Sequence, residues 1–101
     1  MKLIGKGVNV DTKNEYGSTP LHVAALYNQQ TETVLELIKQ GATIDIQDDE
    51  GNTPLHNAAR RGHLNVVCAL VNAGAKKDIT NNKGQIPLDL AKREEIKNAL
   101  K

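Results

Sequence analysis

GNTPLHNAARRGHLNVVCALVNAGA, which runs from Gly51 to Ala75, is the stretch that decides the fold, because much of the chain repeats it imperfectly. An upstream copy, GSTPLHVAALYNQQTETVLELIKQGA, runs from Gly17 to Ala42, and a shortened copy begins with GQIPLDLA at Gly84. The first and second of these opening glycines are 34 residues apart, and the second and third are 33 residues apart. A nearly constant period of this length indicates an array of stacked structural repeats.

The motif T-P-L-H-x-A occurs in full at residues 19–24 and again at residues 53–58. At a period of 33 residues this motif is typical of ankyrin repeats, so the chain resembles the ankyrin-repeat family. The resemblance implies an all-α fold: an ankyrin-repeat solenoid of stacked helix-turn-helix units with β-turn or hairpin-like connections. Any β structure is expected within those connections.

Both full copies carry signals for where their helices begin and end. A threonine precedes a proline at the start of the first helix, which suits the N-cap and the first helical position. A glycine follows the second helix, where a left-handed C-cap is expected. The residues predicted to have this structural role in the two full repeats are Thr19, Pro20, His22, Gly41, Thr53, Pro54, His56 and Gly74.

The chain is long enough for one domain, residues 1–101, with a modest core. Its expected divisions are a partial repeat at 1–13, full repeats at 14–47 and 48–80, and a C-terminal capping repeat at 81–101. The partial repeat matches the end of a second helix and its exit, either because it was cut from a longer array or because the natural cap is minimal. In the last repeat Asp89 replaces the motif histidine and Lys92 replaces the second alanine. Polar residues suit a unit with one face toward solvent.

The first full repeat is one residue longer than the second between the proline and the final glycine. We place the surplus residue in the connection at residues 28–31, because loops tolerate insertions better than packed helices do. Thr31 is a candidate N-cap for the helix that follows. That helix has a broad apolar face that includes Leu35, and Cys68 takes the same place in the next repeat.

Composition excludes several classes of function. The chain has 13 basic and 12 acidic side chains and a net charge of +1, so no overall field favours nucleic acid or a membrane surface. Its single cysteine cannot form an internal disulfide. No apolar run reaches the length of a signal peptide or a membrane span. We therefore expect an intracellular, cytoplasmic location, or the host cytoplasm if the chain is a secreted effector.

Residue types that could carry catalysis or bind a metal are few and scattered. His22 and His56 could be ligands or bases, but as the motif histidines they are expected to bond backbone groups within and between the turns. One cysteine and three histidines cannot supply a closed zinc site. The acidic run at residues 48–50 lacks the other ligands of a calcium loop. The sequence therefore predicts no enzyme, no cofactor and no metal.

Two further residues have simple structural interpretations. His63 lies between the two helices of its repeat, where local hydrogen bonding is expected. Cys68 lies among apolar residues on the second helix and is expected to pack as a small buried side chain.

The resemblance also implies where a partner would bind. In ankyrin-repeat proteins partners are commonly held by the turn tips and by the exposed ends of the first helices, which together form a concave surface. Carried over position by position, the partner-binding residues are Glu15, Tyr16, Ser18, Leu26, Tyr27, Asp49, Glu50, Asn52, Arg60, Arg61, Lys83 and Gln85. The same positions in the last repeat extend this set to Asn82 and Arg93.

Tyrosine and arginine are enriched at binding hot spots, which favours an aromatic patch on the first repeat beside a paired-arginine patch on the second. The alternative for Tyr27 is packing over the connection at residues 28–31. For Arg60 and Arg61 the alternative is an ordinary solvated helix face.

Two functions of different classes follow. The first is a non-catalytic protein–protein interaction module that binds a partner protein on its concave face. The second is a structural or scaffolding segment of a larger multidomain protein, enzyme or effector. A monomer is expected, with self-association through the N-terminal end as an alternative, and nucleic acid is not expected as a partner because no basic stripe with stacking aromatics is present.

Overall fold

The computed structural model describes residues 10–27 and 31–101, which form six helices and no strand. The elements are α1 (Pro20–Ala25), α2 (Thr31–Lys39), α3 (Pro54–Arg61), α4 (Leu64–Asn72), α5 (Pro87–Leu90) and α6 (Glu94–Ala99). The expected helical part of the partial repeat and most of the connection predicted to hold the surplus residue lie outside the described residues. The prediction of an all-α repeat fold is confirmed.

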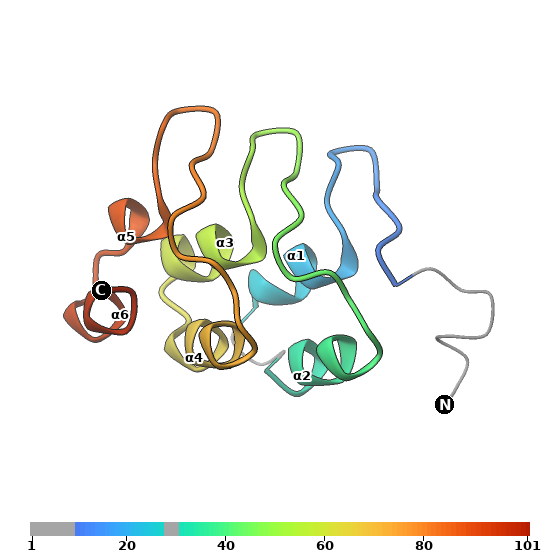
Figure 1. The fold of residues 1–101 in the computed structure, drawn as a ribbon, viewed down its shortest axis with the longest axis horizontal. Coiled ribbons are helices and arrows are strands. Elements are labelled where there is room, and N and C mark those ends of the chain that lie inside the picture. Colours follow the sequence, from blue (N-terminus) through green and yellow to red (C-terminus); the bar gives the residue numbers. More distant parts are fainter. Residues whose placement is uncertain (1–9, 28–30) are drawn as a thin grey trace.

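The helices lie in two layers along the molecule (Figure 1). The first helices α1, α3 and α5 form one layer, and the second helices α2, α4 and α6 form the other. Three long turns project on the same side of the first layer, one ahead of each first helix. In the described part of the chain the main contacts between helices lie within a pair or between neighbouring pairs, as expected for a stacked repeat protein.

The first helix of each full repeat begins with the predicted threonine cap. Thr53 Oγ1 accepts the His56 backbone N–H at 3.3 Å, and the Thr53 backbone N–H donates to His56 Nδ1 at 3.0 Å. Thr19 and His22 make the same pair of bonds. In the last repeat isoleucine has no hydroxyl to accept the first of these bonds, and α5 is only four residues long.

The core lies between the two layers and is made of small and branched aliphatic side chains. Val66, Val67 and Leu70 of α4 are fully buried at the centre of the stack. Three residues of α1 that lie on one side of the helix, namely Leu21, Ala24 and Ala25, form an inward stripe and are also buried. Because alanine is short, the helices of neighbouring repeats can approach closely along this stripe.

The predicted burial of Cys68 is wrong, because its side chain is exposed on α4. Leu35, at the same position of α2, is also 50% exposed, although it was expected on the apolar face. Successive helical residues are turned by about 100° from one another, and Val67 and Leu70 already occupy the inward stripe. Their neighbour Cys68 is therefore turned to the outer surface of the second layer.

His63 does more than the local bonding expected of it. Its Nε2 lies 2.8 Å from the backbone oxygen of Leu26, which belongs to the preceding repeat. The described part of α2 begins at Thr31, directly after residues outside the described part of the chain, so the N-cap at Thr31 stays a prediction.

Candidate partner-binding surface

Each turn tip is built around one side chain that accepts two backbone hydrogen bonds. Asp48 Oδ1 accepts the N–H groups of Glu50 and Asn52, each at 2.9 Å. Asn14 and Asn81 make the same pair of bonds one repeat earlier and one repeat later, at 2.9 to 3.0 Å. This arrangement fixes the backbone of all three tips in the same conformation.

The tips are also joined to one another. The Asp49 N–H donates to the Tyr16 carbonyl at 3.1 Å, and the Asn82 N–H donates to the Glu50 carbonyl at 3.0 Å. The Asn82 side-chain amide adds a bond to the Asp49 carbonyl at 2.9 Å. Side chains on successive tips are therefore held in a row with a fixed spacing.

Two buried histidines each join the first helix of their own repeat to the turn tip of the next repeat. His22 Nδ1 accepts the Thr19 N–H, so the ring proton is on Nε2, which donates to the Asn52 carbonyl at 2.7 Å. His56 repeats this arrangement and donates to the Gln85 carbonyl at 2.8 Å. Burial lowers the pKa of both histidines below the ordinary value of 6.5, which keeps the rings neutral. The prediction that these residues bond backbone groups within and between the turns is confirmed.

A polar cavity of about 360 Å³ opens between the second turn tip (residues 48–52), the third turn tip (residues 81–85) and the ends of the first helices. We call it the tip cavity. Seven residues of the predicted partner-binding set line it, namely Asp49, Glu50, Asn52, Arg60, Asn82, Lys83 and Gln85. Two more lining residues complete it, namely Asn81 and Leu90. Of these, Leu90 lies one period after Asn57, which is buried and was not in the predicted set, so the repeat period gave no signal for it.

The charged side chains of the tip cavity are available to a partner. Among the described residues, Arg60 donates a single long side-chain hydrogen bond of 3.5 Å, to Asn57 Oδ1. Residues 10–27 and 31–101 contain one ion pair, between Arg93 and Glu95. Arg60 and Lys83 therefore form no ion pair with a carboxylate in the described part of the chain. Solvated positive and negative side chains around the opening of one cavity can steer an approaching partner and fix its orientation.

Asn52 forms part of the cavity floor and is only 6% exposed. Its side-chain oxygen accepts the Asn81 amide at 2.9 Å, and its own amide reaches Glu50 Oε1 at 3.4 Å. Asn52 therefore positions Glu50 and Asn81 at the mouth of the cavity and offers little surface of its own.

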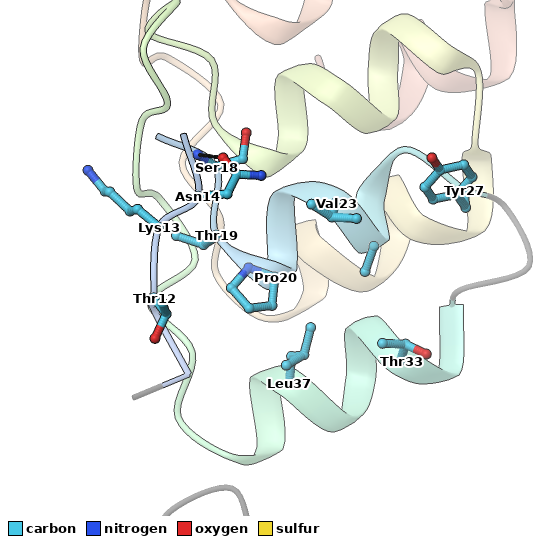
Figure 2. Close-up of a pocket in the computed structure, with 11 residues that line it drawn as sticks. Thr12, Lys13, Asn14, Ser18, Thr19, Pro20, Val23, Tyr27, Thr33 and Leu37 are labelled. Carbon is cyan, nitrogen blue, oxygen red and sulfur yellow. Dashed lines mark hydrogen bonds between the residues drawn. The ribbon is translucent and has the colours of Figure 1, made fainter. Parts of the chain in front are cut away.

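The predicted residues of the first repeat lie elsewhere. Ser18 and Tyr27 line a separate apolar groove at the N-terminal end of the stack (Figure 2). Tyr16 is 66% exposed on the first tip and lines neither hollow. Glu15, Leu26 and Arg61 also line neither of the two. Arg93 donates to the Gly62 carbonyl at 2.9 Å and so is turned toward the second repeat.

In residues 10–27 and 31–101 no three side chains of histidine, cysteine, aspartate or glutamate form a group that could hold a metal ion. None of the described helices is both long and apolar enough to cross a bilayer.

The family comparison agrees with this architecture. The model described as "Ankyrin repeats (3 copies)" matches residues 1–81 and residues 25–101, so the two matches together span the chain. A search of curated proteins found no match. Ankyrin repeats generally mediate protein–protein interaction and are typically non-catalytic. The repeated caps, the stacked tips and the matching family model together place the chain in the ankyrin-repeat family.

Proposed function

We propose that the chain is a non-catalytic interaction module that holds a segment of a partner protein against its turn tips and first helices. The observation that carries this proposal is the tip cavity, where seven residues of the predicted set line one hollow. Hydrogen bonds between the tips hold these residues in place before a partner arrives. A preorganised surface loses less conformational entropy on association than a flexible one does.

The chemistry of the cavity suggests what the partner segment carries. Arg60 and Lys83 offer cationic donors, and Asn82 and Gln85 add amides that can bond a peptide backbone. An extended segment with an acidic side chain near the two cations fits this arrangement. Apolar side chains of the same segment would extend toward the exposed ring of Tyr16 on the first tip.

A charge-reversal pair tests the proposal. Partners captured from the source cell with the wild-type chain are quantified by mass spectrometry, and the affinity of the main partner is then measured by calorimetry. Arg60→Glu is expected to weaken binding at least about tenfold, because it removes a donor and adds a repelling charge. Lys39→Glu is the matched control, since Lys39 is an exposed cation at the end of α2 in the other layer.

The melting temperatures of both variants should stay close to that of the wild type. If Arg60→Glu and Lys39→Glu bind the partner equally well, the tip cavity is not the binding surface. Arg61→Glu then distinguishes the rest of the first-helix surface, because Arg61 lies outside the cavity.

A second candidate function is that of a structural segment within a larger protein. The observation that favours it is the apolar groove at the N-terminal end of the stack, where Val23 and Tyr27 are 41% and 54% exposed. Large apolar side chains exposed together often mark a surface that another element covers.

A further inference from the structure

The groove at the N-terminal end of the stack, which we call the N-terminal groove, has a volume of about 600 Å³. It lies between α1, α2 and the segment at residues 12–14 (Figure 2). Pro20 and Val23 of α1 border it from one layer, and Leu37 of α2 borders it from the other. Its walls are mostly apolar, although it is open to solvent.

The same face of the second repeat is covered by helices. Pro20 and Thr33 are exposed, whereas their equivalents one repeat later, Pro54 and Val66, are fully buried. The reason is that α1 and α2 pack on α3 and α4 at that face. The N-terminal groove is therefore the same stacking surface, one period earlier, without a described helix pair on it.

The chain before α1 already follows the path of a preceding repeat. Asp45 Oδ1 accepts the Lys76 N–H at 3.1 Å, which joins the exit segments of the first and second repeats. One period earlier, Asp11 Oδ1 accepts the Thr43 N–H at 2.9 Å, and Asp11 Oδ2 accepts the Thr43 hydroxyl at 2.7 Å. Residues 10–13 therefore occupy the position of the exit segment of an ankyrin unit that precedes α1.

We propose that the N-terminal groove is the seat of the first helix of a further ankyrin unit, supplied by the same polypeptide. Residues 10–13 are the exit segment of that unit. An ankyrin unit from another chain would bring its own exit segment into the space that residues 10–13 already fill. This inference rests on the second candidate function and is independent of partner binding at the tip cavity.

The structure also indicates what that unit carries. The carbonyl of Asn52 accepts the Asp48 N–H and also His22 Nε2 from the preceding repeat. The equivalent carbonyl of Ser18 accepts the Asn14 N–H alone among the described residues. The donor expected at this position is a motif histidine, so the preceding unit begins with a T-P-L-H type of helix.

A designed extension tests the proposal on the full chain. A copy of residues 48–67 is placed directly before Met1, because residues 1–13 match the part of a repeat that follows position 67 in the period. The added sequence and residues 1–13 then make one complete unit. The melting temperature of the extended chain is expected to be about 5 °C or more above that of the 101-residue chain, since the new helix covers apolar surface in a small repeat protein.

Site specificity is read from Val23→Asp in the two backgrounds. In the 101-residue chain the substitution falls on a partly exposed side chain, so a small drop in melting temperature is expected. In the extended chain the same substitution buries a charge beneath the added helix, and the drop should be at least about twice as large. The control is an extension whose copy of Leu55 is changed to aspartate, which should give no rise.

Several results would overturn the proposal. One is an extension that adds no helical signal or no stability, and another is an equal cost of Val23→Asp in both chains. Light scattering gives a third: a dimer of the 101-residue chain that Val23→Asp dissociates would assign the groove to a second copy. Because these readouts measure stability and mass, they do not depend on whether a partner binds the tip cavity.

Discussion

At the scale of single residues, each of the two motif histidines joins two parts of the backbone through the two nitrogens of its ring. His22 accepts a hydrogen bond at Nδ1 and donates one at Nε2, so one neutral ring joins its own helix cap to the next turn. His56 does the same between the second and third repeats. A protonated ring has no acceptor nitrogen, so protonation would break the hydrogen bond that Nδ1 accepts from the backbone N–H of the capping threonine.

The stability of the fold should therefore fall in mild acid. Burial lowers the folded-state pKa of His22 and His56 below 6.5, so below that pH the unfolded chain binds more protons than the folded chain. The free energy of unfolding should be constant above pH 7 and decrease as the pH falls through 6.5. The slope is at most about 1.4 kcal/mol per pH unit for each histidine.

Urea unfolding at pH 7.5, 6.5 and 5.5 measures this dependence. Asp48 and Asp89 act against the shift, while Lys13 acts with it at His22, but burial is the largest cause at both rings. As the control, a chain with His22→Gln and His56→Gln should be less stable at pH 7.5 and should change less toward pH 5.5. Equal stability of the wild type at pH 5.5 and 7.5 would contradict the prediction.

At the scale of elements, the turn tips show how a local conformation and a neighbour act together. Gly51 and Gly84 have the same left-handed conformation, with φ of 80° and 76°. A Cβ atom on Gly51 would lie 2.6 Å from Asn82 Oδ1 and 2.7 Å from the Asn82 nitrogen, whereas one on Gly84 would meet nothing within 4 Å. The difference arises because another tip stacks against the second tip on the side of Gly51.

Gly84→Ala should therefore cost only the strain of the left-handed conformation, about 1 kcal/mol. Gly51→Ala should cost roughly 2 kcal/mol more, because the backbone of the third tip must move. Urea unfolding of both variants at pH 7.5 gives the two values. Equal costs would show that the tips do not stack as closely as the bonds between them indicate.

Elements built from local signals could be predicted from the sequence, and contacts between elements could not. Thr53 and Pro54 start α3 because their own chemistry satisfies the helix end, and that information is local. The exposure of Cys68 depends on which side of α4 faces the core, and the apolar stretch around it concealed that side. The bond from His63 to Leu26 joins two neighbouring repeats through residues that lie 37 positions apart in sequence.

The candidate site could be predicted as a set of positions but not as a surface. Carrying the family pattern over position by position selected seven residues that the structure brings together at the tip cavity. It also selected Tyr27, which instead borders the N-terminal groove because the first repeat has no described helix pair in front of it. Whether a given position faces a partner or a neighbouring repeat depends on its place in the row.

At the scale of the whole molecule, stability depends on contacts between neighbouring repeats, because each pair of helices buries its apolar side only against the next. Substitutions in the central pair, α3 and α4, are therefore expected to lower the stability of the chain the most. α4 contacts α2, α3 and α6, and Leu70 on α4 is fully buried. Leu35 on α2 has the same chemistry but is half exposed, so it provides a matched comparison.

Leu70→Ala should lower the free energy of unfolding by about 2–5 kcal/mol, because it removes buried methyl groups and leaves a cavity. Leu35→Ala should cost less than about 1 kcal/mol, since half of its surface already contacts water. Both are measured by urea unfolding followed by circular dichroism. A domain of this size has a total stability of roughly 5–15 kcal/mol, so Leu70→Ala removes a large share of it.

The shape of the Leu70→Ala transition then distinguishes two kinds of stack. If the repeats unfold as one unit, the curve stays a single transition at lower urea, because loss of the central contacts weakens both neighbours together. If the outer pairs were stable by themselves, part of the helical signal would persist after the centre has unfolded. The short helices α1 and α5 argue for the single transition, since helices of fewer than about 12 residues are not stable in isolation.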